Sequence, residues 1–177
     1  MERDSEHLDE VATSLERMET IIEDVLAMAR SGQAVEESEL DPIDLADITK
    51  ECWGTVETAD ADLEVRTDAT VWADRDRLRR VLENLVRNAI EHGGQEVTIT
   101  IGGLDDGFFV ADDGPGIPPD DRDSFFEFGY STTDGGTGFG LAIVKEIVAA
   151  HGWSIDVIES DGVGARFEIS GVEFSAE

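Results

Sequence analysis

Two asparagines and a histidine interrupt what otherwise has the pattern of a core helix. In "RVLENLVRNAIEHGG", residues 80–94, apolar side chains recur at helical spacing. Asn84, Asn88 and His92 follow one another every four residues, so they share a neighbouring face. Amide oxygens can ligate Mg²⁺ without adding charge, while phosphates and waters complete the shell. The stripe therefore suits a magnesium–nucleotide complex; the alternative is a pair of buried amides hydrogen-bonded within the protein.

A carboxylate ends an apolar strand in "VADDGPGIPPD". The twofold strand period places Phe108, Val110 and Asp112 on one face, just before two glycines allow a sharp turn. A carboxylate in that position needs a hydrogen-bond donor, which the exocyclic amine of a base would supply. The alternative is an ordinary turn-capping aspartate, a role equally open to Asp113.

A third segment, "GGTGFGLAIV", places glycines directly before an apolar helix. Glycine permits close backbone approach, and the free N–H groups of the first helical turn bind anions such as phosphate. This signal is weak alone. The absence of a GxxxxGK[ST] pattern excludes a Walker-type loop.

The surrounding elements predict the frame for these residues. Helices are expected from about 43 to 56 with Pro42 in the first turn, from 75 to 93 behind an Asp74 cap, and from 139 to 150 before a His151-Gly152 stop. Alternating patterns predict strands in "DLEVRT", "TVWA", "EVTITIGGL", "GFFVADD", "WSIDVIES" and "GARFEIS". Residues 113–138 are expected to form a long lid. This order predicts an α+β two-layer sandwich, with a mixed, mainly antiparallel sheet and helices on one face.

The amino-terminal segment carries a heptad seam. Its apolar residues lie at 8, 11, 15, 18, 22, 25 and 29, and Ile21, Leu26 and Met28 widen the stripe to that of a bundle helix. Such a helix needs a partner from another chain or from a part of the protein beyond this sequence. We expect residues 1–32 to belong to an incomplete dimerisation bundle, 33–41 to be a linker, and 42–174 to form the catalytic domain.

Composition restricts the partners and the environment. Forty-two acidic residues against thirteen basic ones give a net charge of −29, which disfavours nucleic acid. Molar salt shortens the Debye length to roughly 3 Å, so this self-repulsion indicates a salt-adapted, halophilic and haloarchaeal protein, with a merely acidic mesophilic protein as the alternative. Cys52 is the single cysteine, and no apolar run approaches a membrane span. We expect a cytoplasmic protein, with a membrane anchor possible only elsewhere in the full-length chain.

Taken together and in this order, the three segments resemble the ATP-binding catalytic domain of sensor histidine kinases, within the superfamily that includes gyrase, Hsp90 and MutL. "ENLVRNAIEHG" resembles the N box, "DDGPGIP" the first glycine box, "FFEFGYS" the F box and "GTGFGLAIV" the second glycine box. "RMETIIEDVLAMAR" is similar to the second helix of the dimerisation hairpin. The fold implied is the Bergerat-type ATP-binding fold.

The resemblance implies a role for each candidate residue. Asn88 would ligate Mg²⁺, Asn84 would lie beside the phosphates, and Asp112 would bind the adenine amine. His92 would flank the base, where relatives often have an aromatic side chain. The remaining candidates are backbone positions that shape the pocket or surround the phosphates: Gly114, Gly116, Gly136, Thr137, Gly138, Phe139, Gly140 and Leu141.

The activity implied is transfer of the γ-phosphate of MgATP to a histidine outside this domain, and then to an aspartate of a response regulator. The partners implied are that receiver domain, an upstream sensor with the phosphoacceptor helix, and a second copy in a homodimer. Two alternatives remain: a gyrase- or Hsp90-type ATP hydrolase, and a non-catalytic dimerisation module with the same fold. Hydrolases resemble this chain but place a general-base Glu at position 84, and Glu83 lies about 100° around the helix from that stripe.

Two features depart from the family pattern. His7 lacks the Arg and Pro that follow a phosphoacceptor histidine, so that histidine is expected outside this sequence. The segment after the F box contains no Arg or Lys for the triphosphate, which leaves Arg122 and Lys145 as the nearest cations. We interpret the other aromatic and imidazole side chains nearby as packing residues: Phe125, Phe126, Phe128, His151 and Trp153.

Overall fold

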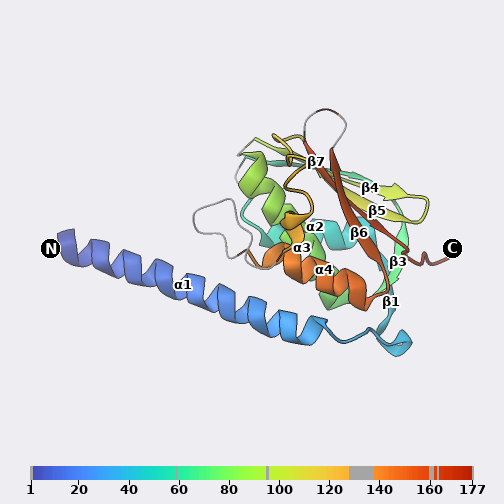
Figure 1. Ribbon diagram of the computed structural model, residues 1–177, viewed down its shortest axis with the longest axis horizontal. Helices are drawn as coiled ribbons and strands as arrows, with labels where there is room; N and C mark the ends of the chain where they lie inside the picture. Colours follow the sequence, from blue (N-terminus) through green and yellow to red (C-terminus); the bar gives the residue numbers. More distant parts are fainter. Residues whose placement is uncertain are drawn as a thin grey trace.

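A long helix leads into an α/β body in the computed structural model of the protein (Figure 1). The structure describes residues 2–58, 60–94, 96–127, 138–159, 162 and 164–176, with side chains left undescribed at 2–6 and 31. The helices are α1 (Glu2–Ser31), α2 (Leu45–Thr55), α3 (Arg75–Gly93) and α4 (Gly140–Ala150), with short 3₁₀ turns η1 (Glu37–Glu39) and η2 (Ser124–Phe126). The strands are β1 (Asp41–Asp44), β2 (Asp62–Arg66), β3 (Thr70–Ala73), β4 (Thr98–Leu104), β5 (Gly107–Asp112), β6 (Ser154–Glu159) and β7 (Ala165–Ser170).

Five strands form the central sheet in the order β2-β4-β5-β7-β6. β2 runs parallel to β4, and every other neighbouring pair is antiparallel, including the β4–β5 and β6–β7 hairpins. β1 and β3 form a separate antiparallel pair. The helices pack against one face of the larger sheet, with α3 against β5 and α4 against β6 (Figure 1). The predicted α+β sandwich with a mixed sheet is therefore confirmed.

The core lies between α3, α4 and the sheet. Most of the apolar stripe predicted for α3 is buried. Val81, Leu82, Leu85 and Val86 are at 0% exposure and Ala89 is at 3%, whereas Ile90 is half-buried. Burying side chains of this size stabilises a fold by about 1.5–3 kcal/mol each. Ile99, Ile101, Phe108, Val110, Phe167 and Ile169 meet them from the sheet. The resulting cluster is large enough to hold the helix stripe next to it in a defined orientation.

The prediction for Pro42 is wrong. Pro42 lies in strand β1, where it pairs in register with Trp72 of β3, and the helix begins only at Leu45. The helical pattern predicted from Ile43 onward is misleading at its start, because the strand β1 buries Ile43 and the helix α2 buries Leu45. Asp44 is the true cap of α2, since its side chain accepts a hydrogen bond from the Asp47 N–H.

The helix start predicted for α3 is confirmed. Asp74 precedes the first turn, and its Oδ1 accepts a hydrogen bond from the Arg77 N–H at 3.0 Å. The asparagine-bearing helix is thus held at its amino end by a cap worth about 1 kcal/mol.

The α1 helix extends from the body, and only its carboxyl end touches it (Figure 1). Ala27 and Met28 pack against the core, whereas the seam residues further out are 48–69% exposed: Leu8, Val11, Leu15, Met18, Ile22 and Val25. Within the part of the chain that the structure describes, no helix combines the length and apolarity needed to cross a membrane.

Candidate functional site

The polar stripe of α3 does not belong to the core. Asn84, Asn88 and His92 are all half-buried, between the buried apolar stripe and exposed positions such as Arg87. The stripe follows the helix axis over two turns, from the middle of α3 to its carboxyl end. Its side chains therefore line a boundary on which a ligand could lie.

The amino terminus of α4 meets this stripe at Asn84. A Cβ atom placed on Gly140 would lie 3.1 Å from Asn84 Oδ1, so the absence of a side chain permits the close approach. The residue before the helix, Phe139, makes no side-chain cap hydrogen bond. The first N–H groups of α4 are thus directed to the space beside Asn84, which is an arrangement that favours phosphate.

Asp112 is buried at the end of β5, on the same strand face as Phe108 and Val110, as predicted. Its Oδ1 accepts hydrogen bonds from the Gly114 N–H at 2.9 Å and the Ala165 N–H at 3.4 Å. Burial raises the pKa of the Asp112 carboxyl, and these two N–H donors partly oppose the rise. Since a carboxylate accepts about four hydrogen bonds, Asp112 retains capacity for the amine of a base.

The turn after β5 brings Asp112 to the carboxyl end of α3. A Cβ atom on Gly114 would lie only 2.5 Å from the Gly93 Cα atom, so the two glycines let the backbones touch. Gly116 has a φ of 78°, which a residue with a side chain rarely adopts. His92 lies near enough to Asp112 to lower its pKa electrostatically.

The His92 ring also faces the F-box segment. Its centroid is 5.9 Å from that of Phe125, which is itself buried and 6.3 Å from Phe167. Phe126 makes an edge-on contact with Phe167 at 6.0 Å. The packing role predicted for Phe125 and Phe126 is confirmed.

The remaining glycine-box candidates are only partly described. Gly138 has a φ of 70°, and Leu141 packs partly buried against the core. Gly136 and Thr137, together with Phe128 and part of the expected lid, lie outside the described residues. The structure brings five of the candidate residues to one side of α3, with Asn88 between two of them on the same stripe: Asn84, Gly140, Asp112, Gly114 and His92.

Glu83 is directed to another part of the molecule. Its Oε1 accepts hydrogen bonds from Arg79 Nε at 3.0 Å and from Thr55 Oγ1, on α2, at 3.1 Å. The prediction that Glu83 leaves the stripe is confirmed. Among the described residues, no group of three or more His, Cys, Asp or Glu side chains is placed to hold a metal. The protein oxygens that the stripe offers to Mg²⁺ are those of the amides.

The two cations nominated from the sequence are poorly placed. Arg122 Nε donates to the Ile117 carbonyl oxygen at 3.2 Å, and Lys145 is an exposed residue of α4. His151 has a structural role, as predicted: its Nδ1 lies 2.8 Å from the Ile147 carbonyl oxygen, and its Nε2 accepts from the Asp74 N–H at 3.1 Å. The Trp153 ring is buried and stacks on it at 4.2 Å.

The Ala165 N–H is a site group that the sequence does not reveal. It lies 53 positions after Asp112, and it reaches that carboxylate because β7 pairs with β5. A strand register of this kind leaves no local signal in the sequence.

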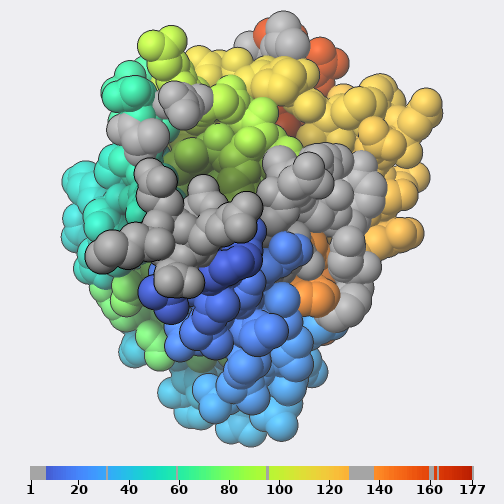
Figure 2. Space-filling model, turned by 90° about the vertical axis from the view of Figure 1, so that its left-hand side faces the viewer, coloured from blue at the N-terminus to red at the C-terminus, as the bar shows by residue number. Residues whose placement is uncertain are grey.

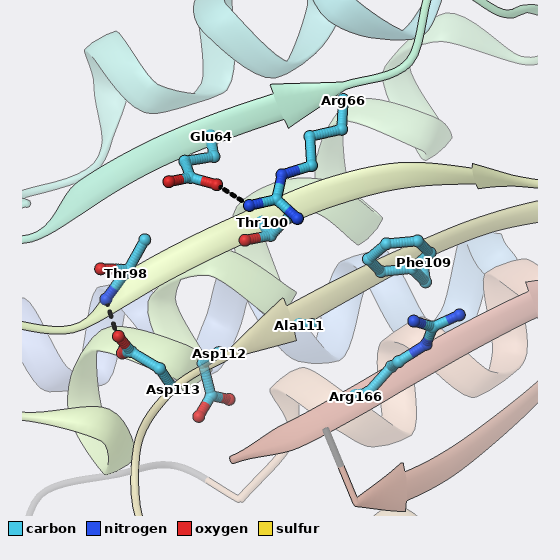
Figure 3. A pocket seen from close by; sticks show the side chains of 9 residues that line it. All are labelled: Glu64, Arg66, Thr98, Thr100, Phe109, Ala111, Asp112, Asp113 and Arg166. Atoms are coloured by element: carbon cyan, nitrogen blue, oxygen red, sulfur yellow. Dashed lines mark hydrogen bonds and ion pairs between the residues drawn. The ribbon is translucent and has the colours of Figure 1, made fainter. Parts of the chain in front are cut away.

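A pocket of about 340 Å³ also lies beside Asp112, on the sheet face away from the helices (Figure 3). Its two cations are already paired, Arg66 with Glu64 and Arg166 with Glu168, and the Asp113 carboxylate accepts a hydrogen bond from the Thr98 N–H. The Arg166 guanidinium also stacks at 3.7 Å over the Phe109 ring. Neither cation is therefore available to a ligand without breaking an ion pair, and the lining lacks the amides and the helix terminus of the stripe.

Comparisons with known proteins agree with this geometry. Residues 73–174, more than half of the chain, match the family described as histidine kinase-, DNA gyrase B- and HSP90-like ATPase. The sensor histidine kinase ZraS of Salmonella typhi is 41% identical over 104 residues, covering 56% of this chain and 22% of the relative. The histidine-protein kinase/phosphatase MprB of Mycobacterium avium is 33% identical over 162 residues, covering 84% of this chain and 30% of the relative. The chain thus spans less than a third of the length of either relative.

Two solved structures share the fold. Full-length ShkA in complex with AMPPNP aligns with a TM-score of 0.72 at 33% identity, covering 89% of this chain and 36% of that one. The mycobacterial sensor histidine kinase MprB aligns with a TM-score of 0.64 at 28% identity, covering 76% of this chain and 97% of that one. With its matched segment spanning the amide stripe, the strand-end carboxylate and the glycine-led helix, the chain belongs to the histidine kinase-, DNA gyrase B- and HSP90-like ATPase family.

Proposed function

We propose that this chain is the ATP-binding catalytic part of a sensor histidine kinase. It would bind MgATP and direct the γ-phosphate to a histidine outside the domain, from which the phosphate passes to a response regulator aspartate. The observation that carries this proposal is the convergence of the α3 amides, the amino terminus of α4 and Asp112 along one side of α3. The kinase names of similar proteins support it, and so does the AMPPNP complex of ShkA.

The roles of the side chains follow from their chemistry. Asp112 would accept the adenine amine, and His92 would lie against the base. Asn88 would ligate Mg²⁺ through its amide oxygen, with phosphate oxygens and water as the other ligands. Asn84 and the α4 terminus would orient the phosphates. Such a site promotes phosphoryl transfer by positioning and charge stabilisation.

Transfer is favoured over hydrolysis by the residue at position 84. An amide cannot remove a proton from water, and the neighbouring carboxylate of Glu83 is held on the α2 side by Arg79 and Thr55. The nucleophile would thus come from another part of the protein.

We assign residues 1–32 to a dimerisation bundle, 33–41 to a linker and 42–174 to the catalytic domain, with the lid at 113–138. The exposed seam of α1 supports self-association in the full protein, next to an upstream sensor and acceptor helix. The charge of −29 supports adaptation to high salt, as in a haloarchaeal cytoplasm.

The first test is a calorimetric titration of the wild-type chain with ATP, with and without Mg²⁺, in about 2 M KCl, where surface charges are screened. We expect Mg²⁺-dependent binding that Asn88→Ala removes and that Arg87→Ala, an exposed change one position away, retains. Unchanged binding by Asn88→Ala would refute the metal assignment. Absence of any heat from the wild-type chain would favour a non-catalytic module.

The second test follows the phosphate. When the chain is supplied with its upstream helix, labelled ATP should yield acid-labile phosphohistidine. When that helix is absent, the chain should release little free phosphate from ATP. Steady phosphate release by the isolated chain would favour a hydrolase.

A further inference from the structure

Helix α3 carries five arginines, and three of them are engaged. Arg75 binds Glu51 at 2.7 Å, Arg79 binds Glu83 at 3.0 Å, and Arg77 donates to the Gln33 carbonyl oxygen at 2.7 Å. Among the described residues, Arg80 and Arg87 have no hydrogen-bond or ion-pair partner. Arg87 is exposed, so water solvates it, whereas Arg80 is half-buried. A partly desolvated guanidinium gains most from an anionic ligand.

Arg80 belongs to the nucleotide-facing stripe. It lies four residues before Asn84, so the positions 80, 84, 88 and 92 form one row along α3. Arg80 lines a groove of about 490 Å³ between α1, α3 and α4. The other lining residues are the apolar side chains of Leu26, Ala27 and Ile147, the cations Arg30 and Arg77, and the carboxylates Glu23, Asp74 and Asp76. The surfaces of α1 (blue), α3 (green) and the start of α4 (orange) reach one face of the molecule in Figure 2.

The direction of the nucleotide along α3 follows from the contacts. The turn that carries Asp112 touches Gly93 at the carboxyl end of α3, so the base would lie there. The amino terminus of α4, which favours phosphate, lies closer to the amino end of α3, at Asn84. The triphosphate would therefore extend toward the amino end of α3, and its terminal phosphate would be nearest to Arg80 and α1.

The triphosphate also needs a cation that the expected lid does not offer. Residues 128–137 include neither Lys nor Arg. Arg122 is bonded to the Ile117 carbonyl oxygen, and Lys145 is exposed on α4. Arg77, the next cation along the helix, is held by Gln33 and Asp74.

We propose that Arg80 binds the terminal phosphate of ATP and so supplies the charge that the lid lacks. This inference rests on the proposed function, because it assumes that MgATP occupies the α3 stripe. Since ADP lacks the terminal phosphate, Arg80 would strengthen the binding of ATP and not that of ADP. The phosphate would be held at the end of the site that faces α1, toward the bundle in which an acceptor histidine is expected.

The test compares MgATP with MgADP by calorimetric titration of the 177-residue chain in high KCl. Arg80→Gln should weaken MgATP binding about ten- to a hundredfold, the loss of a charge-assisted hydrogen bond, and leave MgADP within about twofold. Arg80→Lys should recover part of the difference, because Lys keeps the charge without the planar fork. Arg87→Gln should change neither nucleotide, and thermal melts verify that each variant is folded.

The outcomes separate the two proposals. Equal weakening of MgATP and MgADP by Arg80→Gln, or weakening of neither, would overturn the role of Arg80 while wild-type binding still supports an ATP site. If the folded wild-type chain binds neither nucleotide, the proposed function fails first, and the role of Arg80 fails with it.

Discussion

A buried carboxylate is costly unless something binds it, and Asp112 shows how this chain limits that cost. Two backbone N–H groups hold Oδ1 in place, that of Gly114 in the turn after β5 and that of Ala165 at the start of β7. Burial nevertheless raises the pKa of the carboxyl, so its ionised form destabilises the folded, ligand-free domain at neutral pH. Binding a base amine would relieve this penalty. Asp112 thus lowers the stability of the ligand-free domain and would raise the affinity for the base.

Asp112→Asn tests that interpretation. The amide oxygen can still accept from Gly114 and Ala165, and the buried charge is removed, so we expect a melting temperature equal to or above that of wild type. The amide nitrogen, however, would face the adenine amine donor to donor, which should weaken ATP binding at least about tenfold. Thermal melts and titration measure the two effects.

The control for Asp112→Asn is Asp113→Asn. The Asp113 Oδ1 accepts from the Thr98 N–H at 2.7 Å, a bond that an amide oxygen preserves, so nucleotide affinity should stay unchanged. Equal losses in both variants would point to a general effect of charge at this turn.

His151 predicts a pH dependence of stability. Burial lowers the pKa of its imidazole, and the ring accepts from the Asp74 N–H, which only a neutral ring can do. The unfolded chain therefore binds a proton more readily than the folded one. The contribution of the neutral His151 ring to the free energy of unfolding is therefore fully present above the unfolded pKa of about 6.5. It decreases as the pH falls through that value toward the lower pKa of the folded state.

Urea denaturation between pH about 5.5 and about 8 measures this decrease. His151→Gln should cost about 1–3 kcal/mol at the upper pH, since a buried hydrogen bond is disturbed, and should flatten the pH dependence. His7→Gln, at an exposed site on α1, should keep the wild-type profile. A steep profile in His151→Gln would assign the effect to other groups.

At the scale of elements, the site depends on how α3 and α4 run past each other. Asn84 meets Gly140 at the amino end of α4, and Asp74 meets His151 at its carboxyl end, so the two helices are antiparallel. The antiparallel arrangement places the free N–H groups of α4 against the middle of α3. A side chain at Gly140 would push α4 away from α3, and the amino terminus of α4 would then move away from Asn84.

Gly140→Ala probes the crossing. The new Cβ would lie 3.1 Å from Asn84 Oδ1, so Asn84 would shift by a few tenths of an ångström, and we expect severalfold weaker MgATP binding in a titration. Gly54→Ala in α2 is the matched control, because no described atom lies within 4 Å of the methyl group that this change would add. That change should stabilise the helix by about 0.5–1 kcal/mol and leave binding unchanged. Unaltered affinity in Gly140→Ala would mean that the crossing tolerates a side chain.

At the scale of the whole molecule, α1 presents an apolar seam that the described part of the chain leaves largely uncovered. Leu15→Glu should shift any dimer toward monomer in sedimentation experiments, because a charge would be buried at the seam. Thr13→Glu makes a similar change on another face of the same helix and should leave association unchanged. Equal sedimentation of both variants and wild type would show that this seam does not associate in the isolated chain.

The net charge of −29 acts on the whole molecule as well. Repulsion among the carboxylates opposes the folded state at low salt, and it is screened in molar KCl. We expect the melting temperature to rise by at least about 5 °C between about 0.1 M and about 2 M KCl. A flat profile would indicate an acidic protein without salt adaptation.

Much of this molecule could be predicted from local pattern. The apolar period of α3 identifies both its buried face and the polar stripe beside it, because a helix repeats every 3.6 residues. The cap at Asp74 and the strand ending at Asp112 have signals within a few residues. The strand at Pro42 could not be predicted in this way, because strand β1 ends at Asp44 and helix α2 begins at Leu45. Ile43 is buried as part of the strand and Leu45 as part of the helix, so the two residues together imitate one continuous pattern.

The sequence by itself determined which residues could do chemistry, the helix and strand frame, the net acidity and the apolar seam of α1, since each depends on composition or on neighbours in the chain. Only the tertiary structure decided which of these residues meet. It placed Gly140 on Asn84, Ala165 beside Asp112 and Thr55 of α2 beside Glu83. Such contacts depend on strand register and helix crossing, which result from packing among residues far apart in the chain.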